Sequence, residues 1–348
     1  MRVLILGGTG FIGPSVVRRL YERGHELTLF HRGQHEIETP AEVRHIHCDP
    51  TRQPVEALPE YRETLRELAP DVVLYMVPWS DRDSRILVET IRGIARRVVG
   101  ISSQDVYRAY GRLHGTEPGP IEPVPLTEDS PLREKLYPYR DPNSKQTEYP
   151  LFDMGAYDKI LAERVLMGAS ELAGTILRLP MVYGERDTQH RLYLHLKRMD
   201  DQRPAILLDK GLARWHWTRG YVENVAEAIA LAVTSDQAAG RIYNVGEPFT
   251  LSFADWIQTL AKVVGWQGDI VTFPRESMPP QLLFPVNTDQ DIVTDTSRIR
   301  VELGYQEPVG LDEALRRTVA WERANPPQGL DPRLFDYKAE DELLRSRH

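Results

Sequence analysis

The sequence is poor in cysteine, in long apolar runs and in positive charge. Cys48 is its only cysteine, which excludes an internal disulfide framework and a cysteine metal cluster and fits a reducing compartment. No apolar run approaches the ~18 residues of a membrane helix, and the opening stretch is typical of a core strand, not of a signal peptide. The formal charge of −8 argues against nucleic acid as the main partner. We therefore expect a cytoplasmic protein with no membrane partner.

What the sequence does contain is a glycine turn in its first thirteen residues, MRVLILGGTGFIG. Val3 to Leu6 form a short apolar run rich in β-branched residues, and helical spacing begins at Ile12, so the stretch predicts a strand, a turn and a helix. Such a turn brings backbone N–H groups and the positive end of the helix against a pyrophosphate. The glycines satisfy both GxGxxG and GxxGxxG spacing and are Gly7, Gly8, Gly10 and Gly13. The pattern predicts a dinucleotide site.

Strand and helix signals then alternate along the chain. Strands are expected at 26–30, 43–47, 71–77 and 98–101, and helices at 59–68 and 83–95, which favours a doubly wound parallel sheet, the Rossmann fold. We predict a Rossmann domain at 1–185, completed by about 218–246. A smaller C-terminal substrate domain should comprise 186–217 and 247–325, with a strand at 269–273. The charged tail at 326–348 is expected to be mobile.

The end of the second predicted strand bears on the choice of cofactor. NAD-binding folds often place an acid there, whereas this chain has His31 followed by Arg32. Arg32 can pair with the 2′-phosphate of NADP, so we expect NADP in preference to NAD, the alternative being a solvated loop arginine. His45 and His47 alternate on the next predicted strand. With no further ligand nearby in the sequence, we expect no metal site.

Five motifs in order give the chain a family resemblance. They are GGTGFIG at the start, SSQDVY after the fifth strand, LRLPMVYG at 177–184, GYVENVAEAI at 220–229 and YNVGEP at 243–248. The sequence resembles the extended short-chain dehydrogenase/reductase family, the NAD-dependent epimerase/dehydratase group, over roughly residues 1–325. The residues that we expect to contact the cofactor are Gly7, Gly10, Phe11, Ile12, Gly13, Arg32, Asp49, Met76, Val77 and Pro180.

The resemblance also implies a catalytic serine, tyrosine and lysine. The serine matches Ser103, while Ser102 should face the other way as a structural residue, and the tyrosine matches Tyr157. The lysine of the usual YxxxK spacing is replaced by Leu161. If Tyr157 starts the helix, Lys159 lies about 200° around it and is expected to be solvated. An unassisted tyrosine of pKa ~10 costs about 4 kcal/mol to ionise at pH 7.

Three explanations for the missing lysine stay open. Another cation replaces it, with Lys135, Lys145 and Arg178 as candidates; the tyrosine acts as a neutral donor; or the protein binds its cofactor without doing the family reaction.

The insertion at 107–153, with eight prolines, is too irregular for a helix pair.

The substrate side is less specific. Met181 stands where relatives acting on nucleotide sugars often have asparagine. The cluster at 214–219 either stacks on a ring and pairs with an anion or consists of packing tryptophans beside surface arginines. We predict an NAD(P)-dependent epimerase, dehydratase or reductase acting on the hydroxyl or carbonyl group of a small molecule, favouring a sugar derivative. The alternative is a catalytically silent dinucleotide-binding protein, of the RNA-binding or redox-sensing kind. A homodimer is left open.

Overall fold

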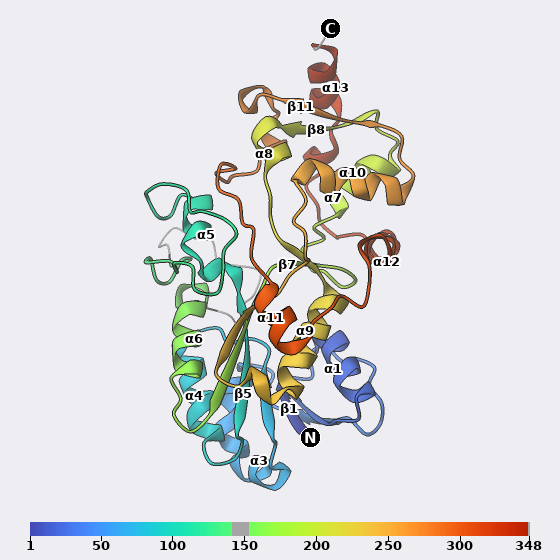
Figure 1. Cartoon of the computed structure of the whole chain (residues 1–348). Coiled ribbons are helices and arrows are strands. Elements are labelled where there is room, and N and C mark those ends of the chain that lie inside the picture. The colour runs from blue at the N-terminus through green and yellow to red at the C-terminus, as the bar shows by residue number, and fades with distance from the viewer. Residues whose placement is uncertain (141–152, 347–348) are drawn as a thin grey trace.

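A seven-stranded parallel sheet organises the molecule (Figure 1). The structure is a computed structural model that describes residues 1–140 and 153–346. The strand order is β10-β6-β5-β4-β1-β2-β3, the doubly wound order extended by one strand. The strands are β1 (Arg2–Leu6), β2 (Glu26–His31), β3 (Arg44–His47), β4 (Val72–Tyr75), β5 (Arg97–Ser103), β6 (Ala173–Leu179) and β10 (Arg241–Asn244).

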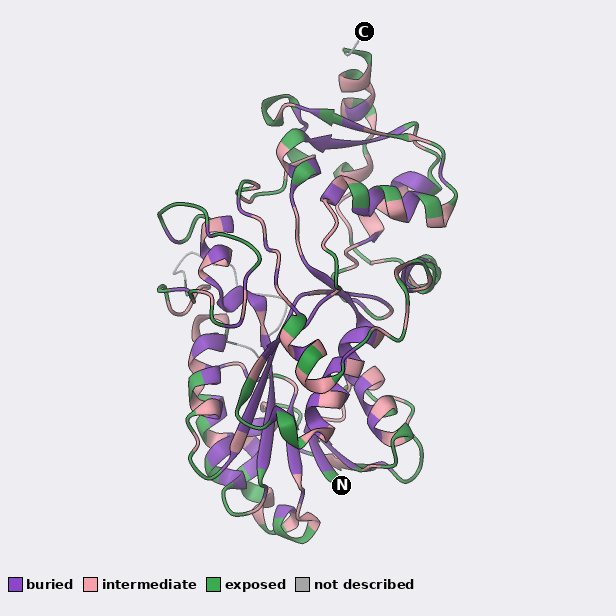
Figure 2. Ribbon diagram, viewed as in Figure 1, coloured by how far each residue is buried: buried purple, intermediate pink, exposed green. Residues whose placement is uncertain are grey.

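Helices cover both faces of this sheet. On one face α1 packs against α9, and on the other α4 packs against α6. The inner strands are buried along most of their length (Figure 2), as both-face coverage requires, whereas the edge strand β3 is more exposed. The helices of this part are α1 (Gly13–Glu22), α2 (Pro54–Ala57), α3 (Arg62–Leu68), α4 (Asp81–Ile91), α5 (Arg108–Leu113), α6 (Lys159–Met167), α9 (Val222–Thr234) and α11 (Ser297–Leu303).

A second part of the molecule lies beyond the carboxyl ends of the sheet strands (Figure 1). It contains a two-stranded parallel sheet, β8 (Ala205–Asp209) with β11 (Asp269–Phe273). A further parallel pair, β7 (Met181–Tyr183) with β9 (Arg219–Tyr221), lies between the two parts. The remaining helices are α7 (Tyr193–Asp200), α8 (Lys210–Arg214), α10 (Phe253–Val264), α12 (Leu311–Ala324) and α13 (Lys338–Arg345).

Short 3-10 turns join several of these elements. They are η1 (Leu58–Tyr61), η2 (Gln104–Val106), η3 (Met154–Ala156), η4 (Asp236–Ala238), η5 (Arg275–Ser277), η6 (Pro280–Leu282) and η7 (Pro332–Phe335). Within the described residues, no helix combines the length and the apolar character needed to cross a membrane.

Most predicted elements are confirmed, and two expectations need correction. The helix expected to begin at Tyr157 begins at Lys159, because the side chain of Asp158 caps it by accepting from the N–H groups of Ile160 and Leu161. Within its described residues, the insertion at 107–153 contains one short helix, α5, and no helix pair, as expected. The segment expected to be a mobile tail forms η7 and α13, and α13 is anchored by an ion pair of 2.6 Å between Arg198 and buried Glu340.

Candidate active site

The glycine turn after β1 has the geometry that the sequence predicts. Gly7 and Gly8 both have φ of +89°, in the left-handed region that favours glycine. A Cβ on Gly13 would lie 2.2 Å from the carbonyl oxygen of Gly8, so this position also needs glycine. A Cβ on Gly10 would meet nothing within 4 Å. The turn is therefore closely packed underneath and open at Gly10.

A cavity of about 180 Å³ lies against this turn. No side chain caps the first turn of α1, so its N–H groups are available to an anion. Four of the predicted cofactor residues line the cavity: Gly7, Gly10, Arg32 and Val77. Open backbone donors at a glycine turn fit the pyrophosphate of a dinucleotide.

The other predicted cofactor residues lie elsewhere. Phe11 and Ile12 pack partly buried against the core, and Met76 lies beside Gly7. Asp49 lies at the surface, where its Oδ1 accepts from the backbone and the hydroxyl of Thr51, and it lines neither of the two cavities described here. Pro180 lines the second, larger cavity. The contact that we predicted for Asp49 has no support in this arrangement.

Arg32 supplies the positive charge at the rim of the smaller cavity. It is partly buried, and among the described residues no hydrogen bond or ion pair of its guanidinium is formed. A guanidinium in that state is available to a phosphate.

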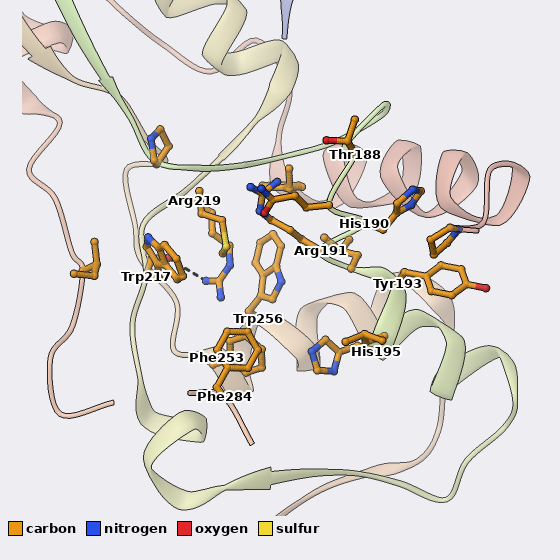
Figure 3. Close-up of a pocket in the computed structure, with 18 of the residues that line it drawn as sticks. Thr188, His190, Arg191, Tyr193, His195, Trp217, Arg219, Phe253, Trp256 and Phe284 are labelled. Carbon is orange, nitrogen blue, oxygen red and sulfur yellow. Dashed lines mark hydrogen bonds between the residues drawn. The ribbon is translucent and has the colours of Figure 1, made fainter. Parts of the chain in front are cut away.

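The larger cavity, of about 850 Å³, lies between the two parts of the molecule. Ser103, at the end of β5, lines it together with Pro180 and Met181 from the β6–β7 segment. Figure 3 shows the opposite side, where aromatic rings surround Arg219. The C-terminal stretch 327–330 also contributes to the lining. Ligands of doubly wound folds bind at this edge of the sheet.

The two serines of β5 point to opposite sides, as their alternation predicts. Ser103 lines the larger cavity, and its Oγ accepts from the backbone N–H of Asp105 at 3.1 Å. Ser102 is buried and donates to Glu163 at 2.5 Å. Glu163 in turn forms a buried ion pair with Arg178 at 2.8 Å. The structural role expected of Ser102 is confirmed.

Tyr157 lies behind the cavity wall. Its hydroxyl donates to Oδ2 of Asp105 at 2.6 Å, and its ring packs edge-on against Trp79. Burial, followed by the charge of Asp105, raises the pKa of Tyr157 well above the ordinary tyrosine value. In this arrangement Tyr157 is a neutral donor to a carboxylate.

Lys159 corrects our expectation of a solvated lysine. It is buried, and its Nζ donates to the carbonyl oxygen of Ile101 at 3.1 Å. The predicted 200° separation fails because Tyr157 precedes α6 and is extended, so helical geometry does not relate the two residues. Burial lowers the pKa of Lys159 to about 8, against the opposing effect of the Asp105 and Glu163 charges.

The other cations considered do not occupy this place. Lys135 is exposed, and the guanidinium of Arg178 already donates hydrogen bonds to Glu163 and to the hydroxyl of Tyr107. Lys145 lies outside the described residues. Two buried cations lie beside the Tyr157 and Asp105 pair. The Nζ of Lys159 is 5.9 Å from the ring centroid of Tyr157, and the Nε of Arg133 donates to the backbone carbonyl oxygen of Asp105 at 2.5 Å.

Asp105 is a site residue that sequence reasoning missed. It lines the larger cavity, and within the described part of the chain its buried Oδ1 has no hydrogen-bond partner. Burial raises the pKa of Asp105, against the effect of the bond from Tyr157. The signal was its place in SSQDVY, two residues after Ser103. A buried carboxylate oxygen without a partner points to a ligand group or a proton.

Arg219 is a buried cation in the lining of the larger cavity. It is buried over the ring of Trp256, 4.5 Å from the centroid, and its Nη1 donates to the carbonyl oxygen of Trp217 at 3.2 Å (Figure 3). Its Nε and Nη2 have no partner among the described residues. Burial lowers the pKa of Arg219 to about 10, against the charge of Glu247. Unpaired donors on a buried guanidinium suit an anionic ligand.

The cluster at 214–219 divides between its two interpretations. Trp217 and Arg219 line the cavity, as the ligand-binding interpretation requires. Trp215 also touches the cavity but is a packing residue, almost fully buried, with its Nε1 donating to the carbonyl oxygen of Gln290 at 2.7 Å. Arg214 is an exposed arginine.

The histidines of β3 have neighbours that the sequence did not reveal. His31 pairs with His47 in the parallel register of β2 and β3, and Glu36 folds back from the following loop. Together with His45, one ligand atom from each of these four residues lies within 4.8 Å of the others. Our expectation that no further ligand lies near His45 and His47 was wrong.

Comparison with known proteins gives a family and several relatives. The model of the NAD dependent epimerase/dehydratase family matches residues 3–246. The chain is 24% identical to 2'-dehydrokanamycin reductase of Streptomyces kanamyceticus, over 86% of this chain and 75% of that one. It is 28% identical to dTDP-glucose 4,6-dehydratase of Streptomyces griseus, over 67% and 60% respectively.

A solved structure repeats the fold over nearly the whole chain. It is the UDP-glucose 4-epimerase of Thermus thermophilus in complex with NAD. The TM-score is 0.62 at 22% identity, and the match covers 93% of this chain and all of that one. The likeness extends through the second part of the molecule as well as the seven-stranded sheet.

Proposed function

The chain belongs to the NAD dependent epimerase/dehydratase family, and we propose that it transfers hydride between NADP and a hydroxyl or carbonyl carbon of a negatively charged sugar derivative. The observation that carries the proposal is the shared cavity. Ser103, Asp105 and Arg219 line one space of about 850 Å³ at the carboxyl edge of the sheet. That space offers a hydroxyl and a carboxylate for the substrate oxygen and a guanidinium for an anion.

Each residue near the reacting atoms has a separate role in such a reaction. Hydride transfer at the nicotinamide C4 is the chemistry that the bound dinucleotide supplies. The hydroxyl of Ser103 orients the substrate oxygen. Tyr157 serves as the proton donor and acceptor of the family reaction. Asp105 accepts a hydrogen bond from the Tyr157 hydroxyl and holds the proton or passes it on. Lys159 supplies positive charge beside this pair.

The choice of substrate class follows from Arg219 and from the relatives. Two relatives are named for dTDP-glucose and UDP-glucose, sugars that carry a diphosphate, and a third for a dehydrokanamycin. A buried guanidinium with free donors favours the anionic class. Trp217 and Trp256, beside it, offer faces for a sugar or base.

A silent dinucleotide-binding protein is the second candidate. The bond from Tyr157 to Asp105 favours it, because a hydroxyl that donates to a carboxylate is not free for substrate. Leu161 at the usual lysine position favours it too.

The preference for NADP is tested by replacing Arg32 with alanine. Loss of a hydrogen bond to a charged group costs about 1.5–3 kcal/mol, so NADPH should bind about ten- to a hundredfold more weakly while NADH is unchanged. Nicotinamide fluorescence during titration measures both. Arg44→Ala, at an exposed arginine of β3, is the matched control. Equal weakening of NADPH and NADH, or a parent protein that prefers NADH, would contradict the proposal.

The choice between enzyme and silent protein needs a separate experiment. Mass spectrometry of ligands released from the purified protein identifies the cofactor and any trapped sugar. The identified sugar is then added with NADP or NADPH, and the absorbance of the reduced nicotinamide is followed. Turnover that disappears in Ser103→Ala supports the enzyme. No turnover, with the dinucleotide still bound, supports the silent protein.

A further inference from the structure

Three imidazoles and a carboxylate meet at the carboxyl ends of β2 and β3. Nε2 of His31 lies 2.9 Å from Nδ1 of His45, and Nε2 of His47 lies 3.1 Å from Oε1 of Glu36. Oε2 of Glu36 is 3.8 Å from Nδ1 of His45. The three histidines come from paired strands, and Glu36 comes from the loop between these strands. We call these four residues the histidine cluster.

These separations match those of a four-coordinate metal centre. Metal bonds of about 2.0–2.1 Å in a tetrahedral arrangement place neighbouring ligand atoms about 3.3 Å apart. Of the six pairs that these residues form, three have ligand atoms 2.9, 3.1 and 3.8 Å apart, which brackets that value. One ligand atom from each residue lies within 4.8 Å of the others, so the widest pairs must move closer together to share one ion. Three neutral imidazoles with one carboxylate suit zinc and its neighbours in the first transition series. We propose that the histidine cluster binds a divalent metal ion of the zinc class, with His31, Glu36, His45 and His47 as its ligands.

The surroundings of His45 support this assignment. A metal-bound histidine normally donates its second ring N–H to an acceptor, which fixes the tautomer and the ring orientation. The Nε2 of His45 lies 2.9 Å from Oγ1 of Thr39, so Nδ1 is left for the metal. The same arrangement also holds the loop that carries Thr39 and Glu36 against β3.

His31 couples the metal to the loop that follows β2. Without metal, Nδ1 of His31 accepts from the backbone N–H of Gly33 at 3.2 Å, which leaves the proton on Nε2 for His45. Metal at Nε2 moves that proton to Nδ1, so the N–H of Gly33 must turn away. Gly33 has φ of +68° and precedes Gln34 and His35, which line the smaller cavity. The metal site is thus built into the rim of the glycine-turn cavity.

The competing explanation is a packing cluster without a metal. The rings of His31 and His47 are edge-on at 4.7 Å, and hydrogen bonds join His31, His45 and Thr39. Such a cluster would bind no metal in preference to the other histidines of the chain. Glu36 and His47 are about half exposed, with exposed side-chain fractions of 54% and 53%. A metal ion can therefore reach the site from solvent, and these two side chains can be changed with little effect on the core.

The test titrates Co²⁺ into the full-length, tag-free protein after a chelator has removed bound metal. We expect saturable visible absorption typical of four-coordinate Co²⁺, and its loss when Zn²⁺ displaces the cobalt. His47→Gln and Glu36→Gln should each lower the Co²⁺ affinity at least about tenfold, since even outer-shell partners of a metal are worth 10–100-fold. His35→Gln, at an exposed histidine of the same loop, should bind like the parent.

A measurement of the fold accompanies the titration. Far-ultraviolet circular dichroism should be the same for the parent and the two cluster variants, and Zn²⁺ should raise the unfolding temperature of the parent more than that of His47→Gln. Absence of a saturable cobalt spectrum in the parent overturns the proposal. So does a spectrum that persists at full affinity in both His47→Gln and Glu36→Gln. Neither result depends on the reaction that the protein catalyses.

Discussion

Among single residues, the proposed reaction depends most on whether Tyr157 can move a proton when Leu161 stands four residues after it. Asp105 and Lys159 are both buried beside Tyr157, and our proposal assigns them to this proton transfer. The carboxylate holds the tyrosine hydroxyl, and the ammonium lies 5.9 Å from the tyrosine ring centroid. Burial of all three groups strengthens their mutual electrostatic effects.

Replacing Tyr157 with phenylalanine tests this unit. Turnover of the identified substrate should fall by about 10²–10⁴-fold, the usual worth of general acid–base catalysis. NADPH affinity should change little, because the hydroxyl of Tyr157 donates to Asp105 and does not line the glycine-turn cavity. Steady-state kinetics and fluorescence titration give the two values. An active enzyme in which Tyr157→Phe keeps full turnover would disprove the assignment of Tyr157.

Lys159 gives a pH prediction whose sign follows from its lowered pKa of about 8. The ammonium is present below that pH and is lost above it, so turnover that needs the charge should decline as the pH rises through about 8. Lys159→Met should lower turnover and remove this decline. Lys210→Met, at an exposed lysine, is the control. A parent profile that is flat between pH 7 and 9 would show that the charge of Lys159 is not used.

Glu247 gives a second pH prediction, on binding. Burial raises the pKa of Glu247 to about 7, against the bond from Tyr183 and the charge of Arg219. Above pH 7 the carboxylate competes with a bound anion for Arg219, and below it the competition ends. UDP-glucose, whose diphosphate stays ionised throughout, should bind about two- to fivefold more tightly at pH 6 than at pH 8, an interaction of up to ~1 kcal/mol.

Calorimetric titration at the two pH values measures this difference. Glu247→Gln should bind UDP-glucose equally at both pH values, and Arg219→Met should lose most of the binding at either. A pH dependence that survives in Glu247→Gln would assign the effect to another group.

At the scale of elements, the glycine turn and α1 separate ligand binding from folding. A Cβ at Gly10 has open space, whereas one at Gly13 strikes the carbonyl of Gly8. Gly10→Val should therefore fold like the parent yet weaken NADPH at least about tenfold, because the new side chain occupies the phosphate position. Gly13→Ala should instead destabilise the fold by about 1–3 kcal/mol, the range for overpacking. Urea unfolding and fluorescence titration distinguish the two.

The reverse pattern would contradict this interpretation of the turn. If Gly10→Val binds NADPH like the parent, the open side of the turn does not face the phosphate.

How much the sequence could predict depends on the range of the interactions. The strand, turn and helix of 1–22 follow from local spacing, and their prediction is confirmed. The start of α6 was misplaced by two residues because Asp158, and not Tyr157, is the capping residue. That small error placed Lys159 on the wrong side of the helix. A local pattern therefore predicts an element better than it predicts the direction of one side chain at its end.

The candidate sites depend on contacts that no local pattern contains. The histidine cluster needs the register that pairs His31 with His47, and Glu36 reaches it only through the path of a loop. The larger cavity combines residues as far apart in sequence as Ser103, Arg219 and Leu330. Sequence analysis could name Ser103 and the 214–219 cluster, but it could not say that both line one cavity.

In the whole molecule, the C-terminal segment contacts both the larger cavity and the α7 region. The stretch 327–330 lines the larger cavity, and α13, which follows it, is attached to the α7 region. Arg198 of α7 donates to the carboxylate of Glu340 and, at 2.8 Å, to the carbonyl oxygen of Leu334. Tyr337 donates to Asp201 at 2.6 Å. One end of the chain therefore helps to shape a cavity whose other wall is the seven-stranded sheet.

Replacing Glu340 with alanine tests this attachment, because it leaves Arg198 buried and unpaired. Breaking one partner of a buried ion pair costs about 3–5 kcal/mol, so Glu340→Ala should unfold at lower urea and expose its C-terminus to protease. UDP-glucose binding should weaken more than NADPH binding, since the glycine turn lies in the other part. Glu342→Ala, at an exposed position of the same helix, should behave like the parent. The double variant Arg198→Met, Glu340→Leu should recover much of the lost stability, because neither charge is then buried alone. If Glu340→Ala matches Glu342→Ala in stability, proteolysis and UDP-glucose binding, the C-terminal segment does not hold the cavity wall in place.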